Sequence, residues 1–125
     1  MLEGATVHAV LPAMDPSRAA QFYTEKVGAV PRESTKGGAF FSIGDSSFSI
    51  YATPNPNRGG HTQMGLRVPD VHAAVRDLQS RGVVFEEYDL PGLKTVDGVA
   101  DVGGASAAWF KDTEGNIIGI LQLDL

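Results

Sequence analysis

The sequence predicts an α+β protein made of two tandem β-α-β-β-β modules, because its second half repeats the plan of its first half. His8 stands seven residues before Asp15, and Gln63 stands seven residues before Asp70, so the halves are offset by 55 residues. Each aspartate opens a helical pattern that stops at a glycine, the residue that most easily ends a helix in a left-handed conformation. A repeat of this kind indicates a duplicated structural unit.

A second alignment closes each half. Residues 41–51 (FSIGDSSFSIY) align with residues 109–119 (WFKDTEGNIIG) at an offset of 68. This offset exceeds the first by 13 residues, so the second half carries an insertion, which we place in the Gly-, Asp- and Val-rich stretch 88–105. Long loops in compact domains are often functional, so two interpretations stay open. The stretch is either a lid over a binding site or a solvent-exposed loop with a short extra strand.

In the first half, a helix is predicted from Asp15-Pro16, where aspartate can cap free amides and proline fits the first helical position. Ala19, Tyr23 and Val27 recur at helical spacing up to Gly28. Strands are predicted where β-prone residues cluster between turn residues. These strands are 6–11, 29–33, 39–43 and 47–52.

The second half follows the same order. Asp70 caps a predicted helix whose inner face carries Val71, Val75 and Leu78, and which ends at Gly82. The predicted strands are 62–68, 83–87, 106–111 and 116–123.

One helix cannot cover both faces of a four-stranded unit. We therefore expect the two modules, about 5–54 and 60–125, to form a single domain over residues 1–125. Its eight strands would make a curved, mostly antiparallel sheet around a cleft, with the helices on the convex side.

The composition narrows the class of protein. Cysteine is absent, which excludes disulfides and thiolate ligands and fits a reducing cytoplasm. The net charge is −5 and the ten Lys and Arg residues are scattered, which argues against a nucleic-acid partner. No apolar run approaches the roughly 20 residues of a membrane span, and no signal peptide is visible. We expect a cytoplasmic globular protein.

Several short patterns resemble one known superfamily. Residues 8–16 (HAVLPAMDP) resemble the first module of the vicinal oxygen chelate proteins, which include glyoxalase I, the bleomycin-resistance proteins and the extradiol dioxygenases. Residues 65–75 (GLRVPDVHAAV) and 108–116 (AWFKDTEGN) resemble the second module. The resemblance covers almost the whole chain and implies the fold. It does not select a reaction, because the superfamily hosts isomerases, transferases, oxygenases and drug binders. Relatives of this length commonly pair, so a homodimer is expected.

The resemblance also implies where a metal would bind. Catalytic members hold a divalent metal through the first and last strands of each module, which by position are His8, Tyr51, Gln63 and Gly119 here. His8 and Gln63 could serve as ligands, but Tyr51 is a neutral phenol and Gly119 has no side chain. Zinc, nickel and iron sites need three or four good ligands. We therefore expect no metal cofactor. A bound Zn, Ni or Fe would use His8, Gln63 and His61.

The remaining cleft residues follow from strand alternation, which also turns Val10, Gly65 and Ile117 inward. Trp109 and its repeat partner Phe41 are placed with equal weight in the cleft, stacking on a planar ligand, or in the core under the helices. The expected ligand-binding residues are His8, Ser49, Tyr51, Gln63, Arg67, Trp109, Gly119 and Leu121.

These residues favour a metal-independent protein that binds a small organic molecule, such as an antibiotic or an aromatic metabolite. Two alternatives stay open. The first is a glyoxalase-like lyase, isomerase or dioxygenase with a divalent metal near His8 and Gln63. The second is a metal-free enzyme that uses His8 or Tyr51 as an acid or base.

Overall fold

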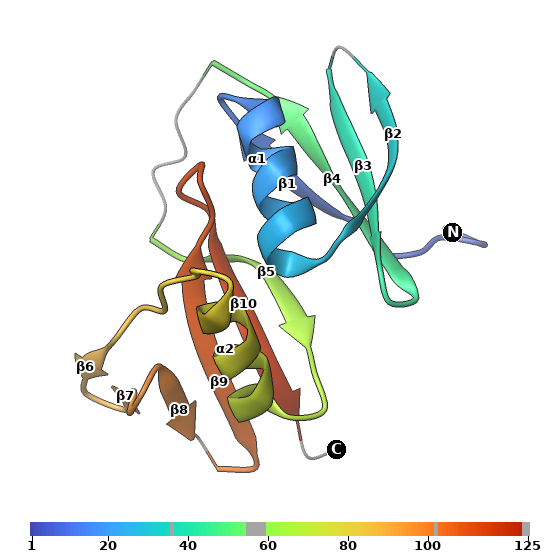
Figure 1. Cartoon of the computed structure of the whole chain (residues 1–125). Coiled ribbons are helices and arrows are strands. Elements are labelled where there is room, and N and C mark those ends of the chain that lie inside the picture. Colours follow the sequence, from blue (N-terminus) through green and yellow to red (C-terminus); the bar gives the residue numbers. More distant parts are fainter. Residues whose placement is uncertain (36, 55–59, 102, 124–125) are drawn as a thin grey trace. The chain divides into compact units, whose positions relative to one another are not determined.

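The structure, a computed structural model, describes residues 1–35, 37–54, 60–101 and 103–123. The chain divides into two compact units, Met1–Pro56 and Asn57–Leu125. Each unit contains a four-stranded sheet with helical residues packed on it (Figure 1). The predicted α+β class with two β-α-β-β-β modules is confirmed. The single domain and the continuous eight-stranded sheet stay predictions. Residue 102 of the predicted insertion and residues 124–125 of the second module lie outside the described residues.

The first unit has the strand order β1-β4-β3-β2, with β1 parallel to β4 and the other pairs antiparallel. Asp15 caps its helix through a bond from the Arg18 amide to Oδ1 at 3.1 Å. The helix ends at Gly28, as predicted, but its last turn is π-helical. The elements are β1 (Ala9–Ala13), α1 (Pro16–Phe22), η1 (Tyr23–Val27), β2 (Val30–Thr35), β3 (Gly38–Ile43) and β4 (Ser46–Ala52).

Aromatic rings build the core of the first unit. The ring of Tyr23, fully buried, meets the ring of Phe48 edge-on at 5.2 Å. Phe48 in turn stacks on Phe41 at 5.2 Å. Leu11 and Ile50 complete this side of the sheet, and neither is more than 2% exposed. Burial of such large apolar surfaces is the main term that stabilises the unit.

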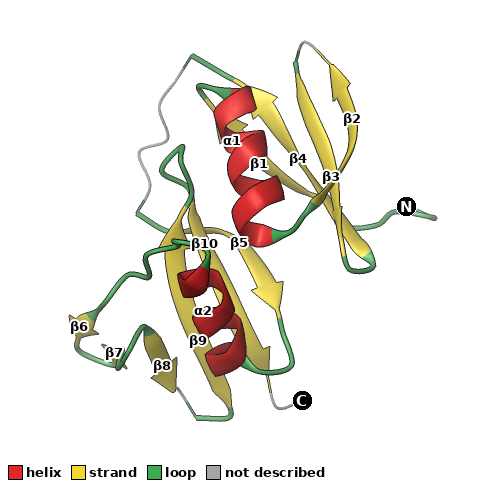
Figure 2. Ribbon diagram, viewed as in Figure 1, coloured by secondary structure: helices red, strands yellow, loops and turns green. Residues whose placement is uncertain are grey.

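The second unit has the strand order β5-β10-β9-β8, with β5 parallel to β10. Asp70 caps α2 through a bond from the Ala73 amide at 3.1 Å, and the Gln122 side chain accepts from the Val71 amide at 2.9 Å. The main elements are β5 (Thr62–Arg67), α2 (Val71–Ser80), β8 (Val99–Asp101), β9 (Ala105–Lys111) and β10 (Ile117–Leu123). Figure 2 shows α2 crossing the long strands β9 and β10.

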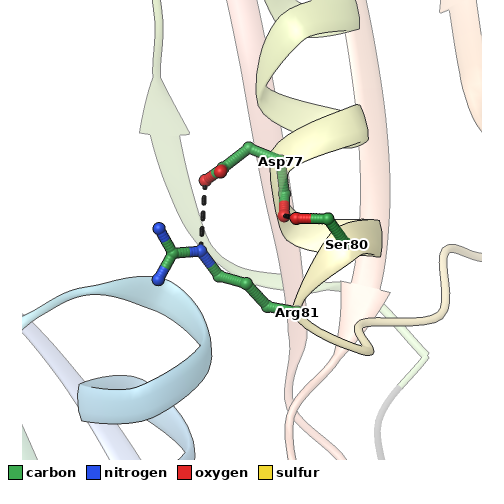
Figure 3. A network of polar contacts seen from close by, with 3 residues as sticks. All are labelled: Asp77, Ser80 and Arg81. Atoms are coloured by element: carbon green, nitrogen blue, oxygen red, sulfur yellow. Dashed lines mark hydrogen bonds and ion pairs between the residues drawn. The ribbon is translucent and has the colours of Figure 1, made fainter.

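The end of α2 carries a small polar network (Figure 3). The Ser80 hydroxyl donates to the Asp77 carbonyl at 2.6 Å, and Arg81 Nε lies 3.4 Å from Asp77 Oδ2. Both charged side chains are about half exposed or more, at 48% and 62%. An exposed pair of this kind contributes little to stability, so the network closes the helix locally.

The edge of the second sheet differs from the prediction. Residues 83–87 form no strand, only an isolated bridge between Phe85 and Phe110. After Glu86, whose amide donates to the Trp109 carbonyl at 2.8 Å, the chain leaves β9 and returns to it at β8. The insertion therefore splits the edge strand, and it forms a short hairpin of β6 (Asp89–Leu90) and β7 (Leu93–Lys94).

Two further points concern the start of β1 and the length of the helices. β1 begins at Ala9, three residues later than predicted, so His8 lies just before it. No helix in the described part of the chain has both the length and the apolar character needed to cross a membrane.

Candidate functional site

Each sheet has one face under its own helix and one face turned away from it, which we call the helix-free face. In the first unit, Phe48 and Ile50 of β4 are buried under the helix, so Ser47, Ser49 and Tyr51 alternate onto the helix-free face. In the second unit, Ile118 and Ile120 are buried under α2, so Gly119 and Leu121 lie on the helix-free face. The predicted site residues of these strands thus lie on the helix-free faces.

A row of three paired residues crosses the helix-free face of the first unit. Ser49 of β4 pairs with Val10 of β1 on one side and with Phe40 of β3 on the other. Ser49 is only 8% exposed, whereas Val10 and Phe40 are 53% and 44% exposed. His8 lies at the end of this face. Its Nδ1 is 3.0 Å from the Ser47 Oγ, and its ring centroid is 6.1 Å from that of Phe40.

The corresponding row of the second unit is Gly65, Gly119 and Trp109. Gly119 of β10 pairs with Gly65 of β5 and with Trp109 of β9. A Cβ built on Gly119 would lie 3.5 Å from Trp109 Nε1 and 3.4 Å from Thr62 Cγ2. The indole therefore leans over the glycine, next to Thr62. The sequence did not predict that Thr62 lies beside Gly119, or that the indole of Trp109 lies against this glycine.

The other predicted residues of the second unit lie around this row. Leu121 pairs with Arg67, and its Cδ1 would be 3.1 Å from a Cβ on Gly65. The Arg67 Nη2 donates to the Leu123 carbonyl at 3.3 Å. Gln63 is the extra residue of a bulge, since Thr62 pairs with Ile117 and Met64 with Ile118. His61 precedes β5 and is exposed.

The registers correct the repeat alignment of the last strands. The offset of 55 relates Val10 to Gly65, and their partners on the neighbouring strands are Ser49 and Gly119. Ser49 is therefore the counterpart of Gly119. Tyr51, which was assigned that place, lies two residues farther along β4, opposite Pro12, and 45% of it is exposed.

The same registers settle the two aromatic residues that the sequence left open. Phe41 is 1% exposed in the core under the helix, and Trp109 lies on the helix-free face with Gly119. The partner of Ser49 on β3 is Phe40, so Phe40 rather than Phe41 corresponds to Trp109. Each row thus sets an aromatic ring, Phe40 or Trp109, beside a small residue, Ser49 or Gly119.

The insertion reaches the row of the second unit. The ring centroid of Tyr88 lies 5.5 Å from that of Trp109, with the ring planes at 75°. Burial raises the pKa of the Tyr88 phenol above its usual value, and the nearby carboxylate of Glu86 raises this pKa further. Glu86 also lies 3.7 Å from the Lys111 ammonium.

The donor atoms of these rows do not fit a divalent transition metal. The first row offers one hydroxyl, from Ser49, and Gly119 gives the second row no side-chain oxygen. His8 is bonded to a serine rather than to an acidic group. In the residues that the structure describes, no three His, Asp or Glu side chains gather where they could hold an ion. Such sites need three or four nitrogen, oxygen or sulfur ligands with compensating charge.

The described residues line a hollow in each unit. One of about 370 Å³ lies at the edge of the first unit and has Gln21, Glu25, Arg32 and Phe41 among its lining residues. The other, of about 330 Å³, is lined by residues 67–69 and 122–123. Only Arg67 of the predicted site residues lines either hollow.

The fold is a pair of β-α-β-β-β modules, each with an aromatic side chain on the helix-free face of its sheet. Residues 5–120 match the family described as the glyoxalase/bleomycin resistance protein/dioxygenase superfamily. The chain belongs to this superfamily, as its resemblance to vicinal oxygen chelate proteins predicted. No curated protein matches the sequence.

Solved structures agree with the fold. UcmS2 is 18% identical with a TM-score of 0.76, over 99% of this chain and all of that one. TnmS3, an antibiotic binding protein from Streptomyces sp. CB03234, is 24% identical with a TM-score of 0.68, over 98% of this chain and 99% of that one. The fosfomycin resistance protein FosX from Listeria monocytogenes is 15% identical with a TM-score of 0.72, over 98% of this chain and 94% of that one. Structural similarity at such low sequence identity shows a shared fold and does not assign a function.

Proposed function

We propose that this protein binds a small planar organic molecule, such as an antibiotic or an aromatic metabolite, without using a metal ion. The observation that carries the proposal is the pair Gly119 and Trp109. The strand position that the resemblance assigns to a metal ligand is a glycine, and the indole of Trp109 lies against it. An aromatic face beside a small residue suits stacking on a planar ring rather than holding a cation.

Two further observations support a small organic molecule as the ligand. The first helix-free face offers an aromatic ring, Phe40, beside the hydroxyl of Ser49. Pockets for small molecules commonly combine apolar walls with a few polar groups of this kind. Among the structural neighbours, one is named an antibiotic binding protein and another an antibiotic resistance protein.

The test combines elemental analysis with a ligand screen. Protein purified without added metal is expected to contain no stoichiometric transition metal. A thermal-shift screen uses three planar probes of different charge: phenazine, phenazine carboxylate and proflavine. Because Trp109 is the only tryptophan, quenching of its emission reports binding directly. At least one probe is expected to stabilise the native protein and to quench this emission.

The matched variants separate stacking from packing. Trp109→Phe keeps an aromatic face, and Trp109→Leu keeps apolar volume without one. Binding is expected to survive in the first and to fall about tenfold in the second, since a stacked base or ring contributes on the order of 1–3 kcal/mol. One tightly held metal per chain would overturn the proposal, as would probes that stabilise Trp109→Leu and native protein equally.

A further inference from the structure

The insertion supplies the aromatic contact that Trp109 makes in this unit. Tyr88 stands where the chain leaves the sheet edge, and its ring meets the indole edge to face at 5.5 Å. The backbone next to it is tied to the same residue, because the Glu86 amide donates to the Trp109 carbonyl at 2.8 Å. The contact therefore comes from a segment that is anchored on β9 just before it departs.

Thr95 fixes the position of Tyr88 from the other end of the β6–β7 hairpin. The Tyr88 amide donates to Thr95 Oγ1 at 2.8 Å, and the Thr95 amide donates to the Tyr88 carbonyl at 2.9 Å. The Thr95 hydroxyl itself donates to Glu87 Oε2 at 2.6 Å. Thr95 is only 7% exposed, so these bonds are shielded from competing water.

The hairpin between these anchors is short and tightly turned. Asp89 pairs with Lys94 and Leu90 with Leu93, which leaves Pro91-Gly92 as the turn. Gly92 has a φ of +80°, which glycine adopts without strain. The segment from Tyr88 to Thr95 is thus a closed structure with its ends bonded together, and not an open loop.

Trp109 has neighbours from two parts of the unit in this arrangement. Tyr88 of the insertion contacts the indole, and Gly119 of β10 lies next to its Nε1 and Cδ1 atoms. A ring held in one rotamer before a ligand arrives loses less conformational entropy on binding. A free indole would have to be ordered by the ligand itself.

We infer that Tyr88 is a positioning residue, which presets the indole of Trp109 for stacking, and that Thr95 holds Tyr88 in place for this purpose. The inference rests on the proposed function. In this inference the insertion does not contact the ligand. It sets ligand affinity indirectly, by holding the indole of Trp109 in place.

The first experiment needs no ligand. Tyr88→Ala and Thr95→Val are expected to shift the emission of Trp109 and to increase its quenching by acrylamide, because the indole gains freedom. Tyr88→Phe keeps the ring and Thr95→Ser keeps the hydroxyl, so both should match the native emission. Circular dichroism and thermal unfolding show whether each variant is folded, and Thr95→Val tests the same inference without removing the Tyr88 ring.

The second experiment measures the Kd of the strongest of the three planar probes. Tyr88→Ala and Thr95→Val are expected to weaken binding about three- to tenfold, while the two conservative variants stay within about twofold of native. Unchanged emission in folded Tyr88→Ala would overturn the inference. Altered emission with an unchanged Kd would overturn it too, and would leave the proposed function standing. If no probe binds native protein, the proposed function fails and the role of Tyr88 in affinity fails with it, whatever the emission shows.

Discussion

The indole of Trp109 leans over Gly119, with Nε1 and Cδ1 at 3.5 and 3.6 Å from the point where a Cβ would stand. These are ordinary van der Waals distances, so the backbone at Gly119 does not require glycine. The glycine instead leaves the indole room to lie close to β10. A side chain longer than alanine would compete with Trp109 for this space.

Gly119→Ala and Gly119→Glu should therefore behave differently. The alanine variant is expected to keep native stability within about 1 kcal/mol, because its methyl group only touches Thr62 and the indole. The glutamate variant has to displace the indole, so the emission of Trp109 should shift and probe binding should fall about tenfold. Fluorescence and thermal-shift titrations check both. Equal probe binding in the two variants would contradict this account of Gly119.

Gly38 gives the opposite expectation for the same substitution. A Cβ there would overlap the Ile50 carbonyl oxygen and lie 3.1 Å from the Tyr51 Cα, which are backbone atoms that cannot move aside. Gly38→Ala is expected to destabilise the protein by about 3 kcal/mol, as overpacking against a rigid neighbour does. Urea unfolding measures the loss, with Gly119→Ala as the matched control. A Gly38→Ala protein as stable as that control would show that the strands separate easily here.

The fold could be predicted because its signals are local and repeated. Asp15 and Asp70 each cap a helix, and the apolar faces of the strands follow their alternation. The faces of individual aromatic residues could not be predicted, since they depend on the length of the hairpin between two strands. The β3–β4 hairpin has a two-residue turn, 44–45, between its strands, whereas the β9–β10 hairpin has a five-residue turn, 112–116. An odd difference in loop length turns aligned residues to opposite faces.

This difference explains why Phe41 and Trp109 were aligned but point to opposite sides. It also explains why Phe40 was missed as a site residue. The sequence does hold a signal for the longer turn, because Asp112, Gly115 and Asn116 are typical turn residues. The contact from Tyr88 had no such signal, since it depends on where the inserted hairpin folds back.

The longer turn depends on Asp112, which is 7% exposed. Its Oδ1 accepts from the Glu114 and Asn116 amides at 2.8 and 2.9 Å, and its Oδ2 accepts from Asn116 Nδ2 at 2.8 Å. Asn116 is 1% exposed.

Asp112→Ala leaves these buried donors without the carboxylate and is expected to cost about 2–3 kcal/mol. Asp112→Asn keeps one acceptor and should cost about 1 kcal/mol. Urea unfolding measures both losses, and the emission of Trp109 reports whether β9 keeps its register. An Asp112→Ala protein with native stability would mean that the turn does not need this carboxylate.

The last prediction concerns the ionisation of Tyr88. Its pKa is raised above the model-compound value of 10.0, first by burial and then by the carboxylate of Glu86. As pH rises past about 10, the phenol of the unfolded chain loses its proton while the folded protein keeps it. The unfolded state then binds fewer protons, so the free energy of unfolding falls with rising pH until the folded phenol also ionises. Below that range Tyr88 contributes no pH dependence.

The measurement is a tyrosinate absorbance titration of native protein minus that of Tyr88→Phe, which isolates this phenol from Tyr23 and Tyr51. The difference curve is expected to lie above the ordinary tyrosine pKa. Glu86→Gln removes the smaller of the two causes, so it should lower the pKa only partly, with burial still holding it above the usual value. In urea unfolding at alkaline pH, Tyr88→Phe should lose less stability than native protein. A Tyr88 phenol that ionises at or below the ordinary value would mean that its ring does not rest against Trp109 in solution.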